Sequence, residues 1–343
     1  MTEQRKPVVA VTVGDPAGVG PEIVAKALTH EAVWQVCLPV VVGDLAVFRR
    51  AAEAVGLKRR LRRVSPVDLE AEADEIPVLD IQSGGERAEI GKISAEGGRA
   101  AFGAIRMAVD LCLEGRATAL ATAPINKESL RLADVPYLDH TEALKKLTKA
   151  ASVFTLFVTD ALRVFFFTRH LPFREIADQI KREPLVQFTA EACEQLSRLG
   201  FREPRVAVAA LNPHGGEGGM FGREEIEEIA PAVEALRARG YNVSGPIPAD
   251  SVFHLAKEGQ YDAVISLYHD QGHIATKTLD FYRTVSLTLG LPFLRTSVDH
   301  GTAFDIAGTG KANEISMVEA ILAAAKFGPL WKGPASGRSK EGP

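Results

Sequence analysis

The sequence has few cysteines and no excess of basic charge. Its 343 residues include three cysteines, which stand far apart at Cys37, Cys112 and Cys193 inside apolar or helical stretches. This usage favours buried thiols in a reducing compartment over disulfides or a cysteine-bound metal cluster. The net charge is −4, and acidic and basic residues are mixed along stretches such as 223–239. We therefore expect no nucleic-acid partner and no binding to a membrane surface.

Long apolar runs are also absent from the sequence. No window reaches the roughly 18 continuous apolar residues of a membrane helix. Residues 1–7 are polar and lack the apolar segment of a secretion signal, so we expect a cytoplasmic protein. Residues 334–343 consist mainly of Gly, Pro, Ser and charged residues, and are expected to fray. The length suits two domains or one large α/β unit.

Strand-like runs alternate with helical patterns along the chain. The first run, 8–13, is rich in valine and leads through a Gly/Pro turn to a helical pattern at 21–28. Such alternation predicts a mostly parallel sheet with helices on both faces. Segment 59–75, rich in charged and turn residues, is expected to be a surface excursion. Further strand-like runs lie at 39–42, 117–121, 152–158, 164–167, 206–210 and 263–267, and further helical patterns at 45–54, 94–113, 175–181, 184–198 and 224–239.

Three histidines, His170, His214 and His269, each come shortly after one of these apolar runs. In an open α/β sheet, ligands bind outside the carboxyl ends of the parallel strands, so we expect these imidazoles at one edge. Three protein ligands and a free fourth position are typical of a catalytic zinc site. A structural role is the simpler interpretation for any one of them alone. Their shared position favours a divalent metal.

The other histidines leave one alternative open. His273 lies four residues after His269 and would also reach a metal if this segment were helical. Gly272 favours a turn there, so we expect His269 to be the ligand and His273 to be a neighbouring or unrelated residue. His30 and His254 lie at or within helical patterns and are expected to be structural.

Two glycine-rich strings follow predicted strands. Residues 14–22, Gly-Asp-Pro-Ala-Gly-Val-Gly-Pro-Glu, lead into a helix whose N–H groups would suit an anion. They match neither the G-x-G-x-x-G fingerprint nor a P-loop, and a structural turn explains them equally well. Residues 211–219 surround His214 with glycines, so the backbone there would allow close approach of a ligand.

The segment 295–313 has the most specific pattern in the chain. Its small residues and alternating polar groups suit a loop that wraps a planar ligand. Asp305 is placed to accept hydrogen bonds from a ribose or an adenine. A long surface loop is the alternative interpretation.

The ordered set of motifs resembles the 4-hydroxythreonine-4-phosphate dehydrogenase family over about residues 8–328. Residues 300–308 are similar to the adenine-binding loop of the isocitrate and isopropylmalate dehydrogenase superfamily. The other strings that carry the resemblance are 14–22, His140-Thr141-Glu142, 168–172, 212–219, 248–250, 268–272 and 287–303. The resemblance implies an isocitrate/isopropylmalate dehydrogenase-like α/β fold, mostly parallel, with two intimately joined α/β/α domains and a cleft between them. These would be a cofactor-side domain of 1–137 plus 281–343 and a metal, substrate and dimerisation domain of 138–280.

The resemblance also implies an activity: a dehydrogenase that uses NAD or NADP and one divalent metal, zinc, magnesium or cobalt. It would oxidise the secondary alcohol of 4-phosphooxy-L-threonine to 2-amino-3-oxo-4-phosphooxybutanoate. Loss of carbon dioxide then gives 3-amino-2-oxopropyl phosphate for pyridoxal phosphate synthesis. Threonate or erythronate 4-phosphate is an alternative substrate, and a metal-dependent hydrolase or acyl-transfer enzyme is a more distant alternative.

Site residues follow from the resemblance, together with a homodimer whose active site lies at the interface. The metal ligands would be His170, His214 and His269. The substrate contacts would be His140, Thr141, Lys277, Ser286 and Arg295. The cofactor contacts would be His300, Gly301, Thr302, Ala303, Asp305, Gly308 and Asn313. Lys277 is also a catalytic candidate, and Asp250 or Asp270 would act as the base or orient an imidazole.

Two positions depart from the family pattern. Ser286 stands where asparagine is usual, and Asp139 replaces the glycine that usually precedes His140-Thr141-Glu142. Serine is shorter and has no amide donor, so the contact with substrate must change. The dehydrogenase prediction is unaffected, but the exact substrate stays open.

Overall fold

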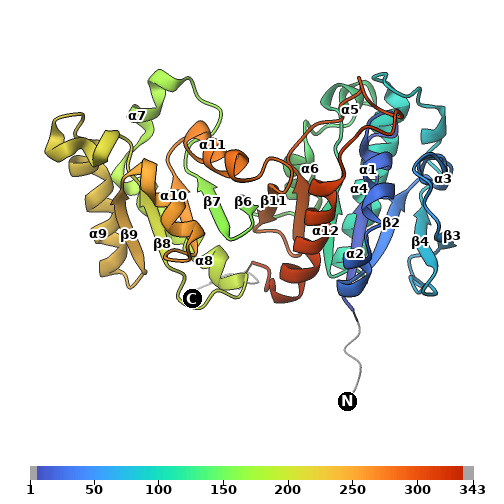
Figure 1. Cartoon of the computed structure of the whole chain (residues 1–343), viewed down its shortest axis with the longest axis horizontal. Helices are drawn as coiled ribbons and strands as arrows, with labels where there is room; N and C mark the ends of the chain where they lie inside the picture. The colour runs from blue at the N-terminus through green and yellow to red at the C-terminus, as the bar shows by residue number, and fades with distance from the viewer. Residues whose placement is uncertain (1–5, 335–343) are drawn as a thin grey trace, which may run out of the picture. The chain divides into compact units, whose positions relative to one another are not determined.

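The chain divides into two units, each built around its own set of strands (Figure 1). This computed structural model describes residues 6–334. Unit 1 comprises Met1–Val153 with Thr288–Pro343, and unit 2 comprises Phe154–Leu287. Apart from Pro334, the predicted frayed tail lies outside the described residues. The predicted domain bounds, 1–137 plus 281–343 and 138–280, stay a prediction.

In unit 1 the strands lie in the order β3-β4-β2-β1-β5-β12, and all neighbours are parallel. The strands are β1 (Val8–Thr12), β2 (Leu38–Gly43), β3 (Arg60–Val64), β4 (Glu75–Asp80), β5 (Ala119–Thr122) and β12 (Leu294–Val298). The helices are α1 (Gly20–Ala27), α2 (Glu31–Val36), α3 (Leu45–Ala54), α4 (Ala95–Leu113), α5 (Lys127–Leu132), α6 (His140–Leu147) and α12 (Ile315–Phe327). The predicted parallel sheet is confirmed.

Helices α4 and α12 cover opposite faces of these strands. Ile105 of α4 packs with Ala10 and Leu120 in one buried cluster. Successive residues of a strand point to opposite faces, so Ala119 faces away from α4. On that side Gly328, just after α12, lies so close that an added Cβ would be 2.8 Å from the Cβ of Ala119. Burial on both faces explains why these strands are continuous apolar runs.

The segment 59–75, predicted to be a surface excursion, contains the edge strand β3, followed by turns at 65–74 that are largely on the surface. Arg60 of β3 pairs with Glu75 of β4 in the ladder, and their side chains form an ion pair at 3.0 Å. Arg63 reaches Asp80 at 3.4 Å. Charged residues are common on edge strands because they oppose pairing with other chains. The same charges that suggested a loop are those of a sheet edge.

In unit 2 the strands lie in the order β6-β7-β10-β8-β9, preceded by β11, which begins in unit 2 and ends in unit 1. The pairs β7–β10, β10–β8 and β8–β9 are parallel, whereas β6–β7 is an antiparallel hairpin. The strands are β6 (Phe154–Thr159), β7 (Leu162–Phe166), β8 (Val206–Ala209), β9 (Val243–Ile247), β10 (Ala263–Ser266) and β11 (Val285–Leu289). The helices are α7 (Ile176–Gln179), α8 (Arg182–Arg198), α9 (Ala230–Ala238), α10 (Ala249–Lys257) and α11 (His269–Leu279).

All three cysteines are buried and unpaired, as predicted. Burial raises the pKa of the Cys37 and Cys193 thiols to about 12, so both are protonated at neutral pH. Across residues 6–334, no helix has the length and apolar character needed to cross a membrane.

Candidate active site

The predicted metal ligands follow the carboxyl ends of β7, β8 and β10, and two of them lie together. The ring centroids of His170 and His269 are 5.8 Å apart. Beyond the strands, the pairing of β7 with β10 continues, because the Thr168 hydroxyl donates to the Leu267 carbonyl at 2.7 Å. This extended pairing carries both histidines to the same edge.

His214 lies on the loop after β8, which has a left-handed backbone. The φ of His214 is +54°, and the next four residues also have positive φ. Glycine adopts this conformation readily, which accounts for the glycine-rich sequence. The buried carboxylate of Glu225 holds the start of the loop, accepting the N–H groups of Leu211 and Asn212 at 2.8 and 2.7 Å. Glu225 is a positioning residue that carried no recognisable signal in the sequence.

The surroundings of His269 suit a metal ligand. Its Nδ1 lies 2.7 Å from Oδ1 of Asp270, which leaves Nε2 to bind a ligand. A carboxylate commonly orients metal-bound histidine in this way. In the part of the chain that the structure describes, however, no group of three or more His, Cys, Asp or Glu is arranged to hold a metal ion. His170 and His269 therefore fit two positions of a metal site, and the set that includes His214 stays a prediction.

The turn predicted at Gly272 was wrong, because α11 begins at His269 and continues through this glycine (Figure 1). A Cβ on Gly272 would lie 2.6 Å from the ring of Phe166, so glycine here allows the helix to pack on β7. His273 consequently lies one turn after His269, with 4.2 Å between ring centroids. It also stacks on Phe166, at 4.5 Å and 23°. The condition under which His273 would also reach a metal is thus met, and its role stays a prediction.

Gln271 is a second residue that the sequence analysis missed. Its side chain is buried, and Oε1 accepts the N–H of Leu267 at 2.7 Å. Its Nε2 donates to the carbonyl of Ala210 at 2.8 Å. These bonds join the ends of β10 and β8, from which His269 and His214 follow. The only signal was its position between two histidines.

The candidate bases differ in their contacts. The bond from Asp270 to His269 favours orientation of the imidazole over proton abstraction. Asp250 lies in the first turn of α10 and accepts a hydrogen bond from Ser251 Oγ at 3.3 Å. Lys277 lies two turns beyond His269 on α11, with its Nζ 5.4 Å from the ring centroid of Phe281. Ser286 is buried in β11.

In unit 1, Arg295 is a buried cation bound only to neutral groups. Its side chain donates to the Thr122 hydroxyl through Nε at 2.9 Å and Nη2 at 2.7 Å, and to the Thr288 hydroxyl through Nη1 at 3.1 Å. Among the described residues it forms no ion pair, although it is 5% exposed. Burial lowers its pKa to about 9, while the charge of Asp139 acts in the opposite direction. A charged guanidinium without a counter-ion fits an anionic ligand.

His140 begins α6 beside this cation. Asp139 caps the helix by accepting the N–H of Glu142 at 3.0 Å, which gives a structural reason for an aspartate at this position. Burial, and then the positive charge of Arg295, holds the pKa of His140 well below its usual value. Its buried Nε2 has no hydrogen-bond partner in the structure. Buried polar atoms normally have partners, so a bound polar group is expected here.

The glycine-rich turn 14–22 lies against the segment 300–313. The Val19 N–H donates to the Thr302 carbonyl at 2.9 Å. The N–H groups of Ala17 and Gly18 are bound by Asp15, at 3.0 Å each. Since these N–H groups are used within the protein, the structural interpretation of the turn is the better one.

The predicted cofactor residues form an irregular loop before α12. Ala303 and Gly308 have positive φ, +40° and +72°, and Asp305 is exposed. His300 Nδ1 lies 3.0 Å from the Gly301 carbonyl, and Asn313 Oδ1 accepts the N–H of Ile315 at 2.9 Å. A cavity of about 100 Å³ lies between the turn and this loop, lined among others by Gly18, Arg50, Ile90 and Gly308.

Asp44 follows β2, near where a Rossmann fold places the acidic residue that binds the cofactor ribose. Here the carboxylate is 4% exposed. It accepts the N–H and hydroxyl of Ser83 at 2.6 and 2.5 Å and the N–H of Gly85 at 2.9 Å. It therefore fixes the loop after β4 and is not placed for a nucleotide.

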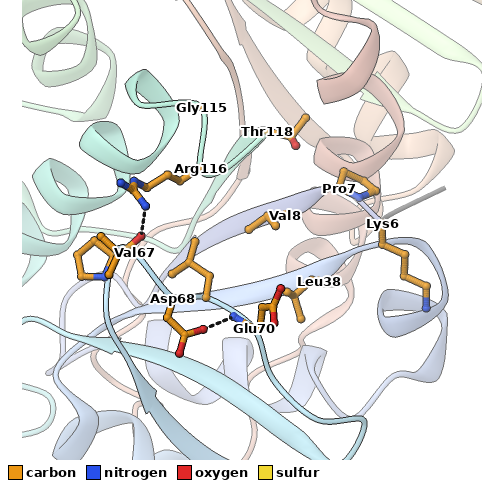
Figure 2. Close-up of a pocket in the computed structure, with 12 residues that line it drawn as sticks. Lys6, Pro7, Val8, Leu38, Val67, Asp68, Glu70, Gly115, Arg116 and Thr118 are labelled. Atoms are coloured by element: carbon orange, nitrogen blue, oxygen red, sulfur yellow. Dashed lines mark hydrogen bonds between the residues drawn. The ribbon is translucent and has the colours of Figure 1, made fainter. Parts of the chain in front are cut away.

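A groove of about 500 Å³ lies at the other, amino-terminal edge of the unit 1 strands (Figure 2). Its charged side chains bind neighbouring residues: Arg116 donates to the Pro66 carbonyl at 3.2 Å, and Asp68 accepts the N–H of Glu70 at 3.2 Å. Nothing in these contacts indicates a ligand.

The α/β fold agrees with the dehydrogenase class predicted from the sequence, and comparison with known proteins supports this class. The chain matches the family model described as "Pyridoxal phosphate biosynthetic protein PdxA" over residues 35–324, and it belongs to this family.

Its similarity to known members extends over nearly the whole chain. It is 47% identical over 330 residues to a Clostridium botulinum protein named "Putative D-threonate 4-phosphate dehydrogenase", covering 96% of this chain and 99% of the relative. A Halalkalibacterium halodurans protein of the same name is 48% identical, with coverage of 95% and 98%. The solved structure of 4-hydroxythreonine-4-phosphate dehydrogenase from Klebsiella pneumoniae is 43% identical, with a TM-score of 0.85 and coverage of 94% and 100%. Both the predicted substrate and the threonate alternative fit these relatives.

Proposed function

We propose that this protein oxidises the secondary alcohol of a phosphorylated four-carbon hydroxy acid, using NAD or NADP and one divalent metal ion. The buried guanidinium of Arg295 is the observation that carries this proposal. Its remaining N–H groups suit a phosphate, which accepts planar, bidentate hydrogen bonds. The phosphate in the names of the relatives agrees with this chemistry.

The other predicted site residues have matching roles. His140 is held neutral, so its imidazole would bind a hydroxyl or phosphate oxygen without adding charge. Lys277 would supply a second positive charge, with Thr141 and Ser286 as polar contacts. His170, His214 and His269 would hold zinc, magnesium or cobalt, which supplies Lewis-acid stabilisation of negative charge on a substrate oxygen.

The reaction removes a hydride from carbon 3 to the nicotinamide and a proton from its hydroxyl, leaving a ketone. Asp250 is the candidate base, since Asp270 is bound to His269. The 3-oxo acid formed in this way loses carbon dioxide readily. The cofactor would lie against His300, Gly301, Thr302, Ala303, Asp305, Gly308 and Asn313.

The candidate substrates are 4-phosphooxy-L-threonine, D-threonate 4-phosphate and erythronate 4-phosphate. The first carries an ammonium at carbon 2, where the other two carry a hydroxyl. The Ser286 position favours the second, because serine replaces the asparagine usual among 4-hydroxythreonine-4-phosphate dehydrogenases. The names of the curated relatives agree.

A substrate panel tests the proposal. Purified protein is mixed with each substrate, or with erythronate 4-phosphate, and with NAD or NADP, before and after chelation and re-addition of each metal. We expect reduced nucleotide to appear with at least one substrate, with release of carbon dioxide. Mass spectrometry distinguishes 3-amino-2-oxopropyl phosphate from dihydroxyacetone phosphate, the product expected from threonate. Hydrolysis or acyl transfer without reduced nucleotide would overturn the proposal.

A further inference from the structure

Side chains from α1 bind alternate residues of the segment just before α12. Glu22, Lys26 and His30 follow one another at intervals of four residues and so lie along one side of α1 and its carboxyl end. They contact Gly310, Ala312 and Glu314, three residues of the irregular segment in which Gly310 has a φ of +74°. Side chains of α1 and its carboxyl end thus bind every second residue of the segment 310–314.

Glu22 and Lys26 together bind both the N–H and the carbonyl group of two residues in this segment. The Glu22 carboxylate accepts the N–H of Gly310 at 3.3 Å and of Ala312 at 3.2 Å. Lys26 Nζ donates to the carbonyls of the same two residues, at 2.8 and 2.6 Å. The two side chains therefore do what a neighbouring strand would do. His30 Nε2 extends the row, 3.1 Å from Glu314 Oε1.

Three of these four bonds are buried or partly buried, and that of Lys26 with the Gly310 carbonyl is exposed. The side chains of Glu22 and Lys26 are 7% and 19% exposed, and they form an ion pair with each other at 3.2 Å. Hydrogen bonds that involve a charged group are stronger than those between neutral groups. The loop is thus fixed in register by two residues that are distant in sequence.

The register decides which side chains of the loop face outward. Ala312 is buried, whereas Lys311 and Asn313 on either side of it are exposed. The bonds to the backbone of Gly310 and Ala312 therefore keep Ala312 buried and Lys311 exposed. Asn313 is one of the predicted cofactor contacts.

We propose that Glu22 and Lys26 are positioning residues that set the register of the cofactor loop, and with it the affinity for the dinucleotide. This inference rests on the proposed role of residues 300–313 in cofactor binding. Neither side chain needs to touch the cofactor.

The first test measures cofactor affinity in the variants Glu22→Gln and Lys26→Met and in the double variant. Isothermal titration gives Kd for NAD and NADP, and steady-state kinetics gives KM and kcat. We expect each single change to raise the Kd and KM for the cofactor about tenfold, with kcat within about twofold. Both side chains hold the same two residues, so the double variant should lose less than the product of the single losses.

Two control variants distinguish an effect on the loop from a general effect of changing the charge of the protein. Glu96→Gln breaks an exposed ion pair with Arg99 on α4, at 2.8 Å, and should leave affinity unchanged. Lys26→Arg keeps a cation and should restore most of it. If Glu22→Gln prevents folding, the more exposed Lys26 still provides the test.

The second test needs no cofactor. Trypsin cleaves after Lys311, and mass spectrometry follows that cleavage. We expect both single variants to be cut there about tenfold faster than the parent protein, with no change in Glu96→Gln. Unchanged Kd in the two variants, with or without faster cleavage, would overturn the inference.

Failure of the proposed function would give a different result from failure of this inference. A parent protein that binds neither NAD nor NADP, and whose cleavage at Lys311 neither nucleotide slows, would remove the cofactor role of the loop. Binding by the parent with unchanged affinity in both variants would remove only the inference.

Discussion

The predicted site residues of the two units differ in their exposure to solvent and in the contacts that hold them within one chain. In unit 1, Arg295 is 5% exposed and held by three hydrogen bonds. In unit 2, the side chain of His269 is 43% exposed, and no three-ligand group is formed among the described residues. The proposed anion site is thus held by contacts within one unit, whereas the proposed metal ligands do not form a complete set among the described residues. A second chain, as predicted for a homodimer, is what we expect to provide it.

The largest effect should come from mixing metal-ligand variants. His214→Ala and His269→Ala should each lose bound metal and at least about a thousandfold of activity. If His214 comes from the partner subunit, a mixture refolded together regains about a quarter of wild-type activity, because half of the dimers have one intact site. Metal content and turnover are measured on the mixture.

One control variant and one control mixture accompany the test of the metal ligands. His254→Ala, a histidine on α10 that we expect to be structural, should leave metal content unchanged. A mixture of His170→Ala and His269→Ala should show no rescue, because these rings lie together in one chain. Equal inactivity of all mixtures would count against sharing.

Next in size, Arg295→Met should separate activity from stability. Loss of a buried charged contact with the phosphate should lower kcat/KM at least about a hundredfold. The free energy of unfolding should stay equal or rise, because a buried charge without an ion pair is removed. Arg99→Met, on the exposed side of α4, is the control. A variant with full activity would remove the anion site from the proposal.

A smaller effect is expected from Gly272→Ala. The new methyl group would overlap Phe166 and should destabilise the protein by about 1–3 kcal/mol. Gly103→Ala on α4 is the matched control, since its Cβ would meet Ile81 at 3.4 Å, an ordinary contact. It should be neutral or stabilising by up to about 1 kcal/mol. Urea denaturation measures both changes, and equal values would show that α11 does not need glycine there.

The smallest effect concerns pH. The pKa of His140 lies below its ordinary 6.5 in the folded protein, so below that pH the unfolded chain binds a proton that the folded chain does not. The free energy of unfolding therefore falls as pH drops, by at most about 1.4 kcal/mol per pH unit for this group. His140→Gln should lose less stability between about pH 7 and about pH 5. Parallel denaturation series would reveal identical slopes if the histidine has no such role.

Strands were predictable where both faces of the sheet are covered, since a run such as β8 shows its burial directly in its composition. The same reasoning failed for β3, whose charges are as typical of an edge as of a loop. The turn predicted at Gly272 was wrong for another reason. Glycine is needed there because an added Cβ would overlap Phe166, which lies far away in sequence. Histidines at strand ends were visible, but Gln271 and Glu225 were not, because their contacts exist only after folding. The local sequence pattern thus indicates which residues are buried. The contacts that position the site residues form only in the folded protein.

The position of Asp44 restricts how nucleotide preference can be engineered in this chain. In a Rossmann enzyme, the acid after the second strand discriminates between NAD and NADP, so exchanging it alters that choice. Here such an exchange would release Ser83 and Gly85 and disturb the loop after β4, which packs against the proposed cofactor loop at Ile90 and Gly308. We therefore expect redesign to succeed at outward positions after β12, such as Asp305, Lys311 and Asn313.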